Sequence, residues 1–312
     1  MEFERLNALG KERKPFFFIT DFSGQKVEAY PLEELDAQGI AFCIDETYQY
    51  KHHPFVLEKK PVSFEEYLEK FSYVQEKIRA GDTYMLNLTQ PTKIIMPLTL
   101  SEIYAHANAH YKLLYKDKFV CFSPEKFIQI QNNTIHTFPM KGTIDASIPH
   151  AKEKILADAK ESAEHVMVVD LLRNDLSIVA KKVRVERFRY VHEIEAGAKK
   201  LLQVSSHICG DLEDSWHANV GDILRALLPA GSVSGAPKKS TVKIIQQVEG
   251  YERGFYCGVF GVYDGTSLES GVMIRFIEKT DEGLVYKSGG GITIESDARS
   301  EYNELLDKVY LP

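Results

Sequence analysis

The sequence contains two short segments with strand-forming residues, 127–130 and 134–138, and Asn132-Asn133 lies between them. Paired asparagines suit the tight turn of a β-hairpin, so the segments predict two adjacent strands of an antiparallel sheet. Pro139 cannot donate to a strand ladder, and Gly142 permits backbone angles that other residues avoid. We therefore predict that the second strand ends in a tight turn over residues 139–143.

Lys141 lies within this predicted turn. A lysine that projects from a strand end into a cleft loses its proton more readily when it is desolvated, and it then becomes a nucleophile. A solvated turn lysine is the simpler alternative, and the residue alone does not decide between the two.

The composition narrows the class of protein. The chain has 312 residues, 44% hydrophobic and 27% charged, which predicts a folded protein of one large domain or two. A net charge of −7 argues against a general nucleic-acid binder. The sequence has no apolar run of membrane-spanning length, and its four cysteines are scattered. We expect a cytoplasmic protein without a nucleic-acid or membrane partner.

Three helices are indicated before residue 180. The first begins after Ser63, which forms a predicted capping box with Glu66, and it ends before Gly81. A second helix is predicted over 101–115, with His106 and His110 on an exposed face. The third has apolar residues at helical spacing from 155 to 171 and carries Glu164 at its edge.

The last part of the sequence is rich in short strands, predicted over 254–263, 271–277 and 283–286. Arg275 interrupts an apolar strand, and a nearly buried arginine needs an anionic partner. The final helix is capped by Asp297 and carries three charged residues on one face. These residues are Glu301, Glu304 and Lys308.

Taken in order, these segments resemble the chorismate-utilising enzymes from about Ser63 to the C-terminus. The resemblance is strongest over 164–176, 229–238 and 253–258. It implies an α+β fold of two orthogonally packed antiparallel β-sheets flanked by helices. It also implies a catalytic, chorismate-binding domain over 63–312, with residues 1–62 as a short N-terminal segment packed on the core.

Within this family, the turn around Lys141 resembles that of aminodeoxychorismate synthase component I. Anthranilate synthases have alanine at this position, and the enzymes that add water use a lysine where this chain has Met85. The resemblance therefore implies a transferase that converts chorismate and ammonia to 4-amino-4-deoxychorismate, for para-aminobenzoate and folate biosynthesis. The alternatives are an anthranilate synthase component I and a non-catalytic partner of a glutaminase.

The resemblance also implies roles for individual residues. Lys141 would add to C2 of the ring, Glu125 would protonate the departing C4 hydroxyl, and His207 would lie near the ring. Mg²⁺ would be held by Glu164 and Glu304, with Glu301 beside them. The expected substrate-binding residues are Gly142, Thr143, Tyr256, Arg275, Gly289, Gly291 and Lys308.

Ammonia requires a source. None of the four cysteines lies in the GxCxG pattern of a glutamine-hydrolysing nucleophile. The resemblance therefore implies a separate glutamine amidotransferase subunit as partner.

Overall fold

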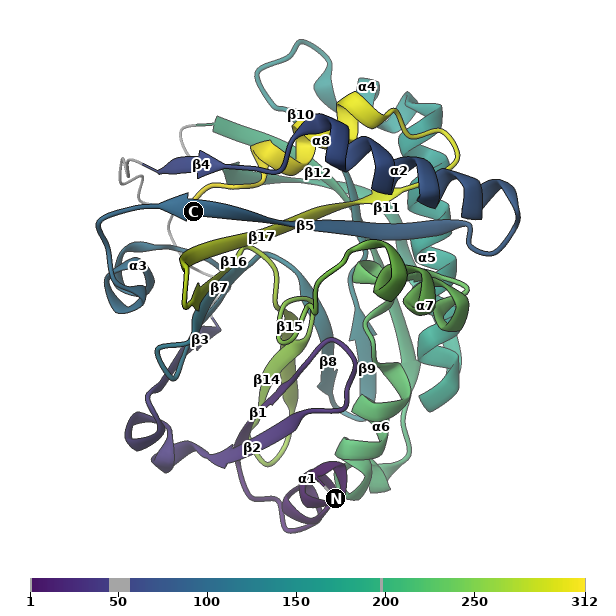
Figure 1. Ribbon diagram of the computed structural model, residues 1–312. Helices are drawn as coiled ribbons and strands as arrows, with labels where there is room; N and C mark the ends of the chain where they lie inside the picture. The colour runs from purple at the N-terminus through teal and green to yellow at the C-terminus, as the bar shows by residue number, and fades with distance from the viewer. Residues whose placement is uncertain (1, 45–56, 197–198, 312) are drawn as a thin grey trace. The chain divides into compact units, whose positions relative to one another are not determined.

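The computed structural model describes residues 2–44, 57–196 and 199–311 (Figure 1). The chain divides into two compact units, each built from three separate stretches. The first unit contains Met1–Glu34, Glu125–Ser232 and Gly258–Val272, and the second contains Leu35–Pro124, Val233–Cys257 and Met273–Pro312. Residues from the N-terminal segment 1–62 thus contribute strands to both units.

The first unit is organised around a nine-stranded antiparallel sheet in the order β10-β12-β9-β8-β15-β14-β1-β2, with β11 paired to β12. Its strands are β1 (Phe16–Thr20), β2 (Val27–Pro31), β8 (Lys126–Gln131), β9 (Thr134–Thr137), β10 (Met140–Asp145), β11 (Lys181–Ala196), β12 (Lys199–Asp211), β14 (Val259–Tyr263) and β15 (Leu268–Val272). Its helices are α1 (Glu2–Lys11), α4 (Ala151–Ala157), α5 (Ala159–Val179) and α6 (Val220–Leu227), with short 3-10 turns at Leu32–Glu34 and Asp214–Asn219.

The position of β1 follows from its composition. All five residues of this strand are buried, and an unbroken apolar run of this kind suits an interior strand. It lies between β2 and β14 (Figure 1). On the other side of the unit, α5 packs against β10, β11 and β12.

The second unit contains an eight-stranded antiparallel sheet in the order β13-β5-β17-β16-β7-β6-β3, with β4 paired to β5. Its strands are β3 (Ile40–Ile44), β4 (Glu58–Lys60), β5 (Met85–Ile95), β6 (Tyr111–Tyr115), β7 (Phe119–Ser123), β13 (Gly235–Ala236), β16 (Phe276–Thr280) and β17 (Gly283–Ile292). Its helices are α2 (Phe64–Arg79), α3 (Leu100–His106), α7 (Lys238–Val248) and α8 (Ala298–Asp307), with a 3-10 turn at Asp36–Gln38. A further 3-10 turn, Gly231–Val233, joins the units in the chain.

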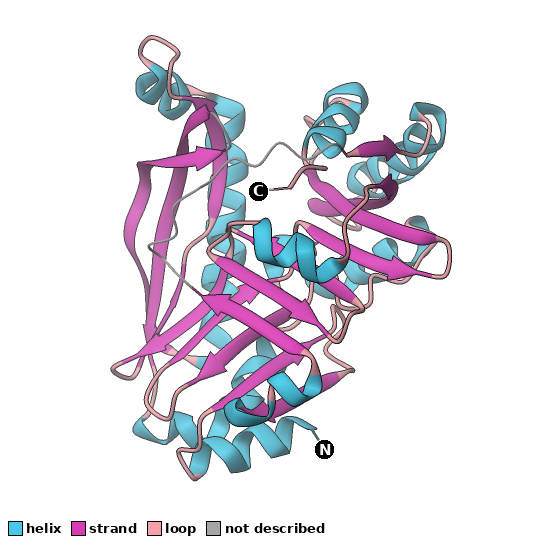
Figure 2. Ribbon diagram, turned by 90° about the vertical axis from the view of Figure 1, so that its left-hand side faces the viewer, coloured by secondary structure: helices cyan, strands magenta, loops and turns pink. Residues whose placement is uncertain are grey.

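The predicted α+β class, with antiparallel sheets and helices, is confirmed (Figure 2). The hairpin of β8 and β9 is confirmed, and its Asn132 and Asn133 adopt the expected positive φ angles of 52° and 56°. The start of α2 is also confirmed, because the Ser63 hydroxyl accepts a hydrogen bond from the Glu66 amide. Among the described residues, none of the helices has the length and apolar character that a membrane crossing requires.

Four predicted elements differ from the structure. The strand predicted over 254–263 begins only at Val259, and the helix predicted over 155–171 is divided at Asp158 into α4 and α5. The helix predicted over 101–115 ends at His106, and Tyr111–Tyr115 forms β6, where buried and partly buried side chains alternate with the period of a strand. The strand predicted over 271–277 is two strands, β15 and β16, which belong to different sheets. Arg275 lies between them with a φ of 52°.

Candidate active site

Lys141 lies on a bulged strand rather than in the predicted turn. β9 and β10 follow one another along the same edge of β12, and the Pro139 carbonyl accepts a hydrogen bond from the Ser206 amide between them. From Met140 to Thr143 the chain advances three residues while β12 advances two, so the bulge contains Lys141 and Gly142. Gly142 has a φ of 95°, which an L side chain rarely adopts. A β-bulge re-aims the side chain that it carries.

The bulge brings Lys141 to Glu164 on α5. The Lys141 Nζ lies 2.7 Å from Glu164 Oε2, and Glu164 is 6% exposed. Lys160 lies farther away, with its Nζ 3.9 Å from the other carboxylate oxygen. Of the residues predicted for catalysis and metal binding, these two are in direct contact.

His165, the next residue on α5, holds the backbone of Lys141. Its Nδ1 is 3.2 Å from the Lys141 carbonyl oxygen, and its Nε2 is 2.7 Å from the Ser206 hydroxyl. A carbonyl oxygen can only accept, so Nδ1 carries the proton and Nε2 accepts from Ser206. The Ser206 hydroxyl in turn accepts a hydrogen bond from the Arg189 backbone amide, so a series of three hydrogen bonds connects Arg189 to Lys141. Burial lowers the pKa of His165, which agrees with a neutral ring.

Glu161 is a site residue that the sequence interpretation missed. It lies one turn before Glu164, and a Cβ added to Gly142 would stand 3.2 Å from its Oε2. That oxygen is buried and has no hydrogen-bond partner among the described residues. Burial raises the pKa of Glu161, while the charge of Lys141 opposes the shift. The signal was present in the sequence, because Glu161 and Glu164 have the same i, i+3 spacing as Glu301 and Glu304.

Glu125 lies at the beginning of the β8–β9 hairpin, as predicted. Its side chain accepts a hydrogen bond from the Ser232 hydroxyl, and its backbone carbonyl accepts from the Val272 amide. Glu125 is partly buried, so a carboxyl group is held at this strand end by a neutral donor.

His207 is not next to Lys141 and Glu164; its neighbours are His136 and Phe138. Its ring is bonded to His136, with 2.9 Å between Nε2 of His207 and Nδ1 of His136, and it stacks on Phe138. Side chains alternate along a strand, so His207 and Ser206 point to opposite faces of β12. Since Ser206 is the residue that contacts His165 on α5, the ring of His207 is on the other face of the sheet.

In the second unit, three predicted residues converge over one glycine. A Cβ added to Gly290 would lie 3.3 Å from Glu301 Oε2, 3.7 Å from Glu304 Oε1 and 3.8 Å from Lys308 Nζ. Lys308 also forms an ion pair with Glu304 at 2.6 Å and donates to the Gly289 carbonyl at 2.8 Å. The sequence predicted Gly289 and Gly291 as binding residues, but it is Gly290, between them, that faces the carboxylates.

The other predicted binding residues have separate surroundings. A Cβ at Gly289 would meet Thr89 and Leu88 of the paired strand β5 at 2.5 and 2.6 Å, so close strand packing is enough to require this glycine. Tyr256 is 3% exposed. The guanidinium of Arg275 lies 5.3 Å from the centre of the Tyr310 ring, and its Nε is buried without a partner among the described residues. Thr143 is exposed on β10 and pairs with Gln203.

Carboxylate oxygens are the donors that Mg²⁺ prefers, so the residues predicted for the metal fit it chemically. The predicted residues are Glu164 in the first unit and Glu301 and Glu304 in the second. Glu161, which was not predicted, lies one turn before Glu164 on the same helix. Each unit thus presents two glutamates at i, i+3 on one helix, each beside a lysine.

A family model and the curated relatives of this chain indicate the same protein family. A family model described as chorismate binding enzyme matches residues 20–311. The chain is 49% identical to an "Uncharacterized PabA-like protein" of Haemophilus influenzae, over 99% of this chain and 95% of that protein. It is 34% identical to aminodeoxychorismate synthase component 1 of Salmonella typhimurium, over 78% of this chain but only 56% of that protein.

A solved structure supports the fold. The crystal structure of a putative 2,3-dihydroxybenzoate-specific isochorismate synthase from Bacillus anthracis matches with a TM-score of 0.72, covering 98% of this chain and 86% of that one at 21% identity. At that identity the likeness concerns the fold alone. The family model covers most of the sequence, and the chain belongs to the chorismate binding enzymes.

Proposed function

We propose that this protein is the synthase component of an aminodeoxychorismate synthase, which converts chorismate and ammonia to 4-amino-4-deoxychorismate. The observation that carries the proposal is a lysine on a bulged strand, aimed at a buried glutamate and fixed through its backbone by His165. Family members that make anthranilate place alanine there, and the similarity to an aminodeoxychorismate synthase of Salmonella typhimurium supports the same assignment.

Lys141 acts as the nucleophile in this proposal. Its Nζ forms a bond to ring C2, the double bonds shift, and the C4 hydroxyl leaves as water after taking a proton from Glu125. Ammonia then bonds to C4, the double bonds return, and the C2–Nζ bond breaks to release Lys141. The net change replaces the C4 hydroxyl by an amino group and produces one water.

The ion pair with Glu164 favours the charged form of Lys141, so the amine must lose a proton before it attacks. The carboxylate at 2.7 Å is positioned to accept that proton. Glu164, Glu301 and Glu304 remain the proposed Mg²⁺ ligands, and a bound Mg²⁺ would supply positive charge for the ring carboxylate of chorismate.

Ammonia is proposed to come from a separate glutamine amidotransferase. Ammonium at high concentration should therefore replace glutamine and that partner. This makes it possible to test the synthase chain by itself.

The test is a product assay with chorismate, ammonium and Mg²⁺, performed with and without an aminodeoxychorismate lyase. We expect para-aminobenzoate only when the lyase is present. Fluorescent anthranilate formed without the lyase would contradict the proposal and would assign the chain to the anthranilate synthases. Binding of a glutaminase without turnover of chorismate would identify a non-catalytic partner instead.

A further inference from the structure

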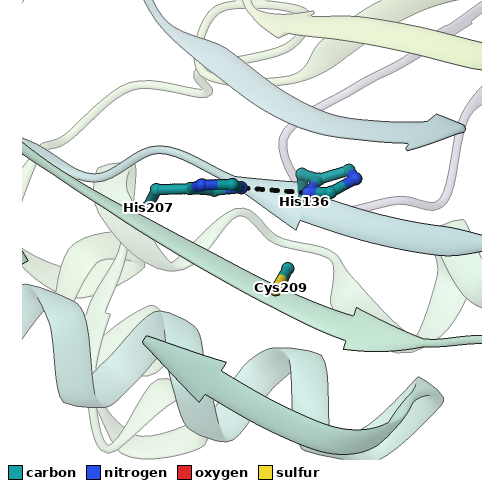
Figure 3. Close-up of side chains that lie close together, drawn as sticks. All are labelled: His136, His207 and Cys209. Atoms are coloured by element: carbon teal, nitrogen blue, oxygen red, sulfur yellow. Dashed lines mark hydrogen bonds between the residues drawn. The ribbon is translucent and has the colours of Figure 1, made fainter. Parts of the chain in front are cut away.

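A second group of chemically capable side chains lies on the face of β12 opposite to Ser206. His136 on β9 is directly opposite Cys209 on β12, and His207 lies two residues before Cys209 on the same face. One ring nitrogen of His136, one ring nitrogen of His207 and the Sγ of Cys209 all lie within 4.8 Å of one another. Figure 3 shows the three side chains together, with the two rings joined by a hydrogen bond of 2.9 Å.

We propose that His136, His207 and Cys209 form a binding site for a divalent transition-metal ion such as Zn²⁺, distinct from the predicted magnesium ligands. Two imidazole nitrogens and one thiolate form a donor set that Zn²⁺ accepts and Mg²⁺ does not. The proposal does not depend on the function proposed above.

The geometry is close to what such an ion requires. In a tetrahedral site with bonds of about 2.0–2.3 Å, the donor atoms are about 3.3–3.6 Å apart. The two ring nitrogens are 2.9 Å apart, so small side-chain rotations open the space for an ion. Both rings are partly buried and Cys209 is 2% exposed, so an ion can enter from the side of the rings.

Glu186 on β11 is the proposed fourth ligand, in addition to His136, His207 and Cys209. The Cys209 thiol donates to Glu186 Oε2 at 3.5 Å, so this carboxylate is adjacent to the thiol that must become a thiolate. When the metal–sulfur bond forms, the thiol proton leaves to Glu186 and then to water, after which the carboxylate can take the fourth position. Of the nearby cations, Lys126 pairs with Glu269 at 2.9 Å. Arg184 is shared between Asp211 and Glu186 Oε2, each at 3.1 Å, so Glu186 reaches the ion by exchanging its contact with Arg184 for the metal.

The site would join two strands that lead to Lys141. His136 and Lys141 are separated by four residues along one edge of β12, and Ser206, which bonds His165, is the neighbour of His207. A metal ion that binds β9 to β12 would stabilise the strand pairing from which the bulge begins.

The experiment is a Zn²⁺ titration of the full chain in excess Mg²⁺, with a chromophoric chelator as competitor. Excess Mg²⁺ occupies carboxylate sites and leaves the nitrogen and sulfur donors to Zn²⁺. We expect one tightly bound Zn²⁺ per chain, and a loss of affinity of at least about tenfold in Cys209→Ser, His136→Ala and His207→Ala, since even outer partners of metal ligands cost that much. Cys43→Ser and His106→Ala, in the second unit, are the matched controls and should bind as the unmodified chain does.

Co²⁺ provides a second measurement. Bound to this site, Co²⁺ should give a thiolate charge-transfer absorption that Cys209→Ser abolishes and Cys43→Ser retains. If Cys209→Ser fails to fold, His207→Ala tests the same site from a partly exposed position. Failure of the unmodified chain to bind Zn²⁺, or equal binding by His207→Ala and the unmodified chain, would overturn the proposal.

Discussion

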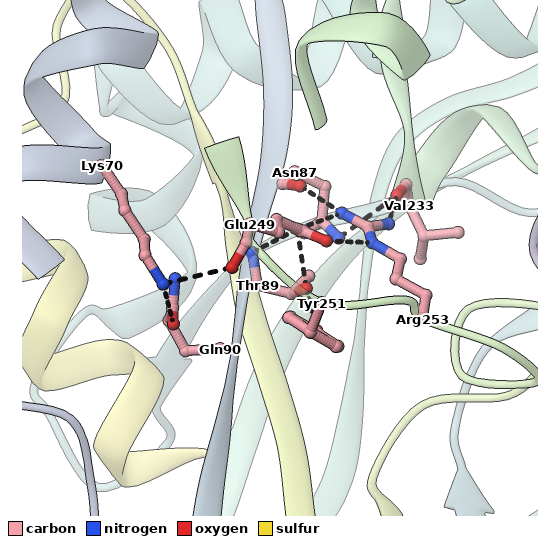
Figure 4. Close-up of polar contacts among 8 residues, drawn as sticks. All are labelled: Lys70, Asn87, Thr89, Gln90, Val233, Glu249, Tyr251 and Arg253. Carbon is pink, nitrogen blue, oxygen red and sulfur yellow. Dashed lines mark hydrogen bonds and ion pairs between the residues drawn. The ribbon is translucent and has the colours of Figure 1, made fainter. Parts of the chain in front are cut away.

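The first unit contains the ion pair of Lys141 and Glu164, and the second contains the ion pair of Arg253 and Glu249. The two pairs differ in how many of their polar atoms have hydrogen-bond partners. In the second unit, Arg253 and Glu249 are 2% and 1% exposed and share hydrogen bonds of 2.6 and 2.9 Å. The guanidinium also donates to the carbonyls of Val233 and Asn87, and Glu249 accepts from the amide and hydroxyl of Thr89 (Figure 4). In the first unit, Lys141 is 29% exposed, and the adjacent Glu161 has a buried oxygen without a partner among the described residues.

This difference separates a structural pair from a reactive one. A buried arginine such as Arg253, each of whose three nitrogens donates to a fixed acceptor, cannot be exchanged without leaving its carboxylate partner unpaired. Lys141 is partly exposed and has two carboxylates near it, those of Glu164 and Glu161. Its ion pair with Glu164 can therefore break, so that Glu164 can bind a substrate or a metal ion instead. We therefore expect the same kind of substitution to affect stability in one unit and catalysis in the other.

The largest effect should come from Lys141→Ala. Removing the nucleophile should lower kcat/KM for aminodeoxychorismate formation with ammonium by at least about 10⁴-fold, because no other group replaces the covalent step. The matched control is Lys160→Ala, which removes a cation 3.9 Å from the same carboxylate and should leave the rate within about threefold. Near-normal turnover by Lys141→Ala would remove this residue from the mechanism.

Arg253→Gln tests the structural pair. It leaves Glu249 buried without its cation, so we expect a loss of about 3–5 kcal/mol in the free energy of unfolding, measured by denaturant titration. Arg225→Gln is the matched control, since Arg225 pairs with Asp222 at the surface and should cost less than about 1 kcal/mol. Equal losses in the two variants would remove the distinction between the pairs.

His165→Ala should affect the position of Lys141 rather than its chemistry. Without the imidazole the Lys141 carbonyl loses its donor, and we expect kcat to fall by about 10²-fold, because small misplacements of a reacting group cost that much. Ser206→Ala should give a smaller decrease in the same direction. If His165→Ala changed only KM, a role in binding would replace the positioning role.

The smallest effect concerns acid stability through His217. Its Nδ1 donates to the Tyr263 hydroxyl, which donates to the Gly265 carbonyl, and burial lowers the pKa of His217 from 6.5 to about 4. The unfolded chain therefore takes up a proton first, and stability that is present above pH 6.5 is lost as the pH falls toward 4. We expect this residue to contribute about 2 kcal/mol to that loss. Unfolding curves of His217→Gln should show a correspondingly weaker pH dependence, and an unchanged dependence would contradict the assignment.

Local patterns in the sequence predicted the hairpin, the caps of α2 and α8, and the helices that carry Glu164 and Glu304. They did not predict the bulge at Lys141, because the strand that defines it, β12, pairs with β10 only after some sixty residues of intervening chain, so no local signal marks the mismatch. The helix predicted to reach Tyr115 failed because tertiary pairing with β3 and β7 overrides helical spacing in a short apolar segment. Glu161 has the local pattern of a solvated glutamate at a helix edge, and only the pairing of β10 with β12 and the packing of α5 bring Gly142 beside it.

The interleaving of the two units has a consequence for biosynthesis. The first sheet needs β1 and β2 from the beginning of the chain and β14 and β15 from near its end, so it cannot close until ribosomal synthesis has passed Val272. Until then the apolar Phe16–Ile19 has no β14 to pair with. Nascent chains stalled before β14 should consequently be held by chaperones, and no single cut can release either unit as an independent fragment.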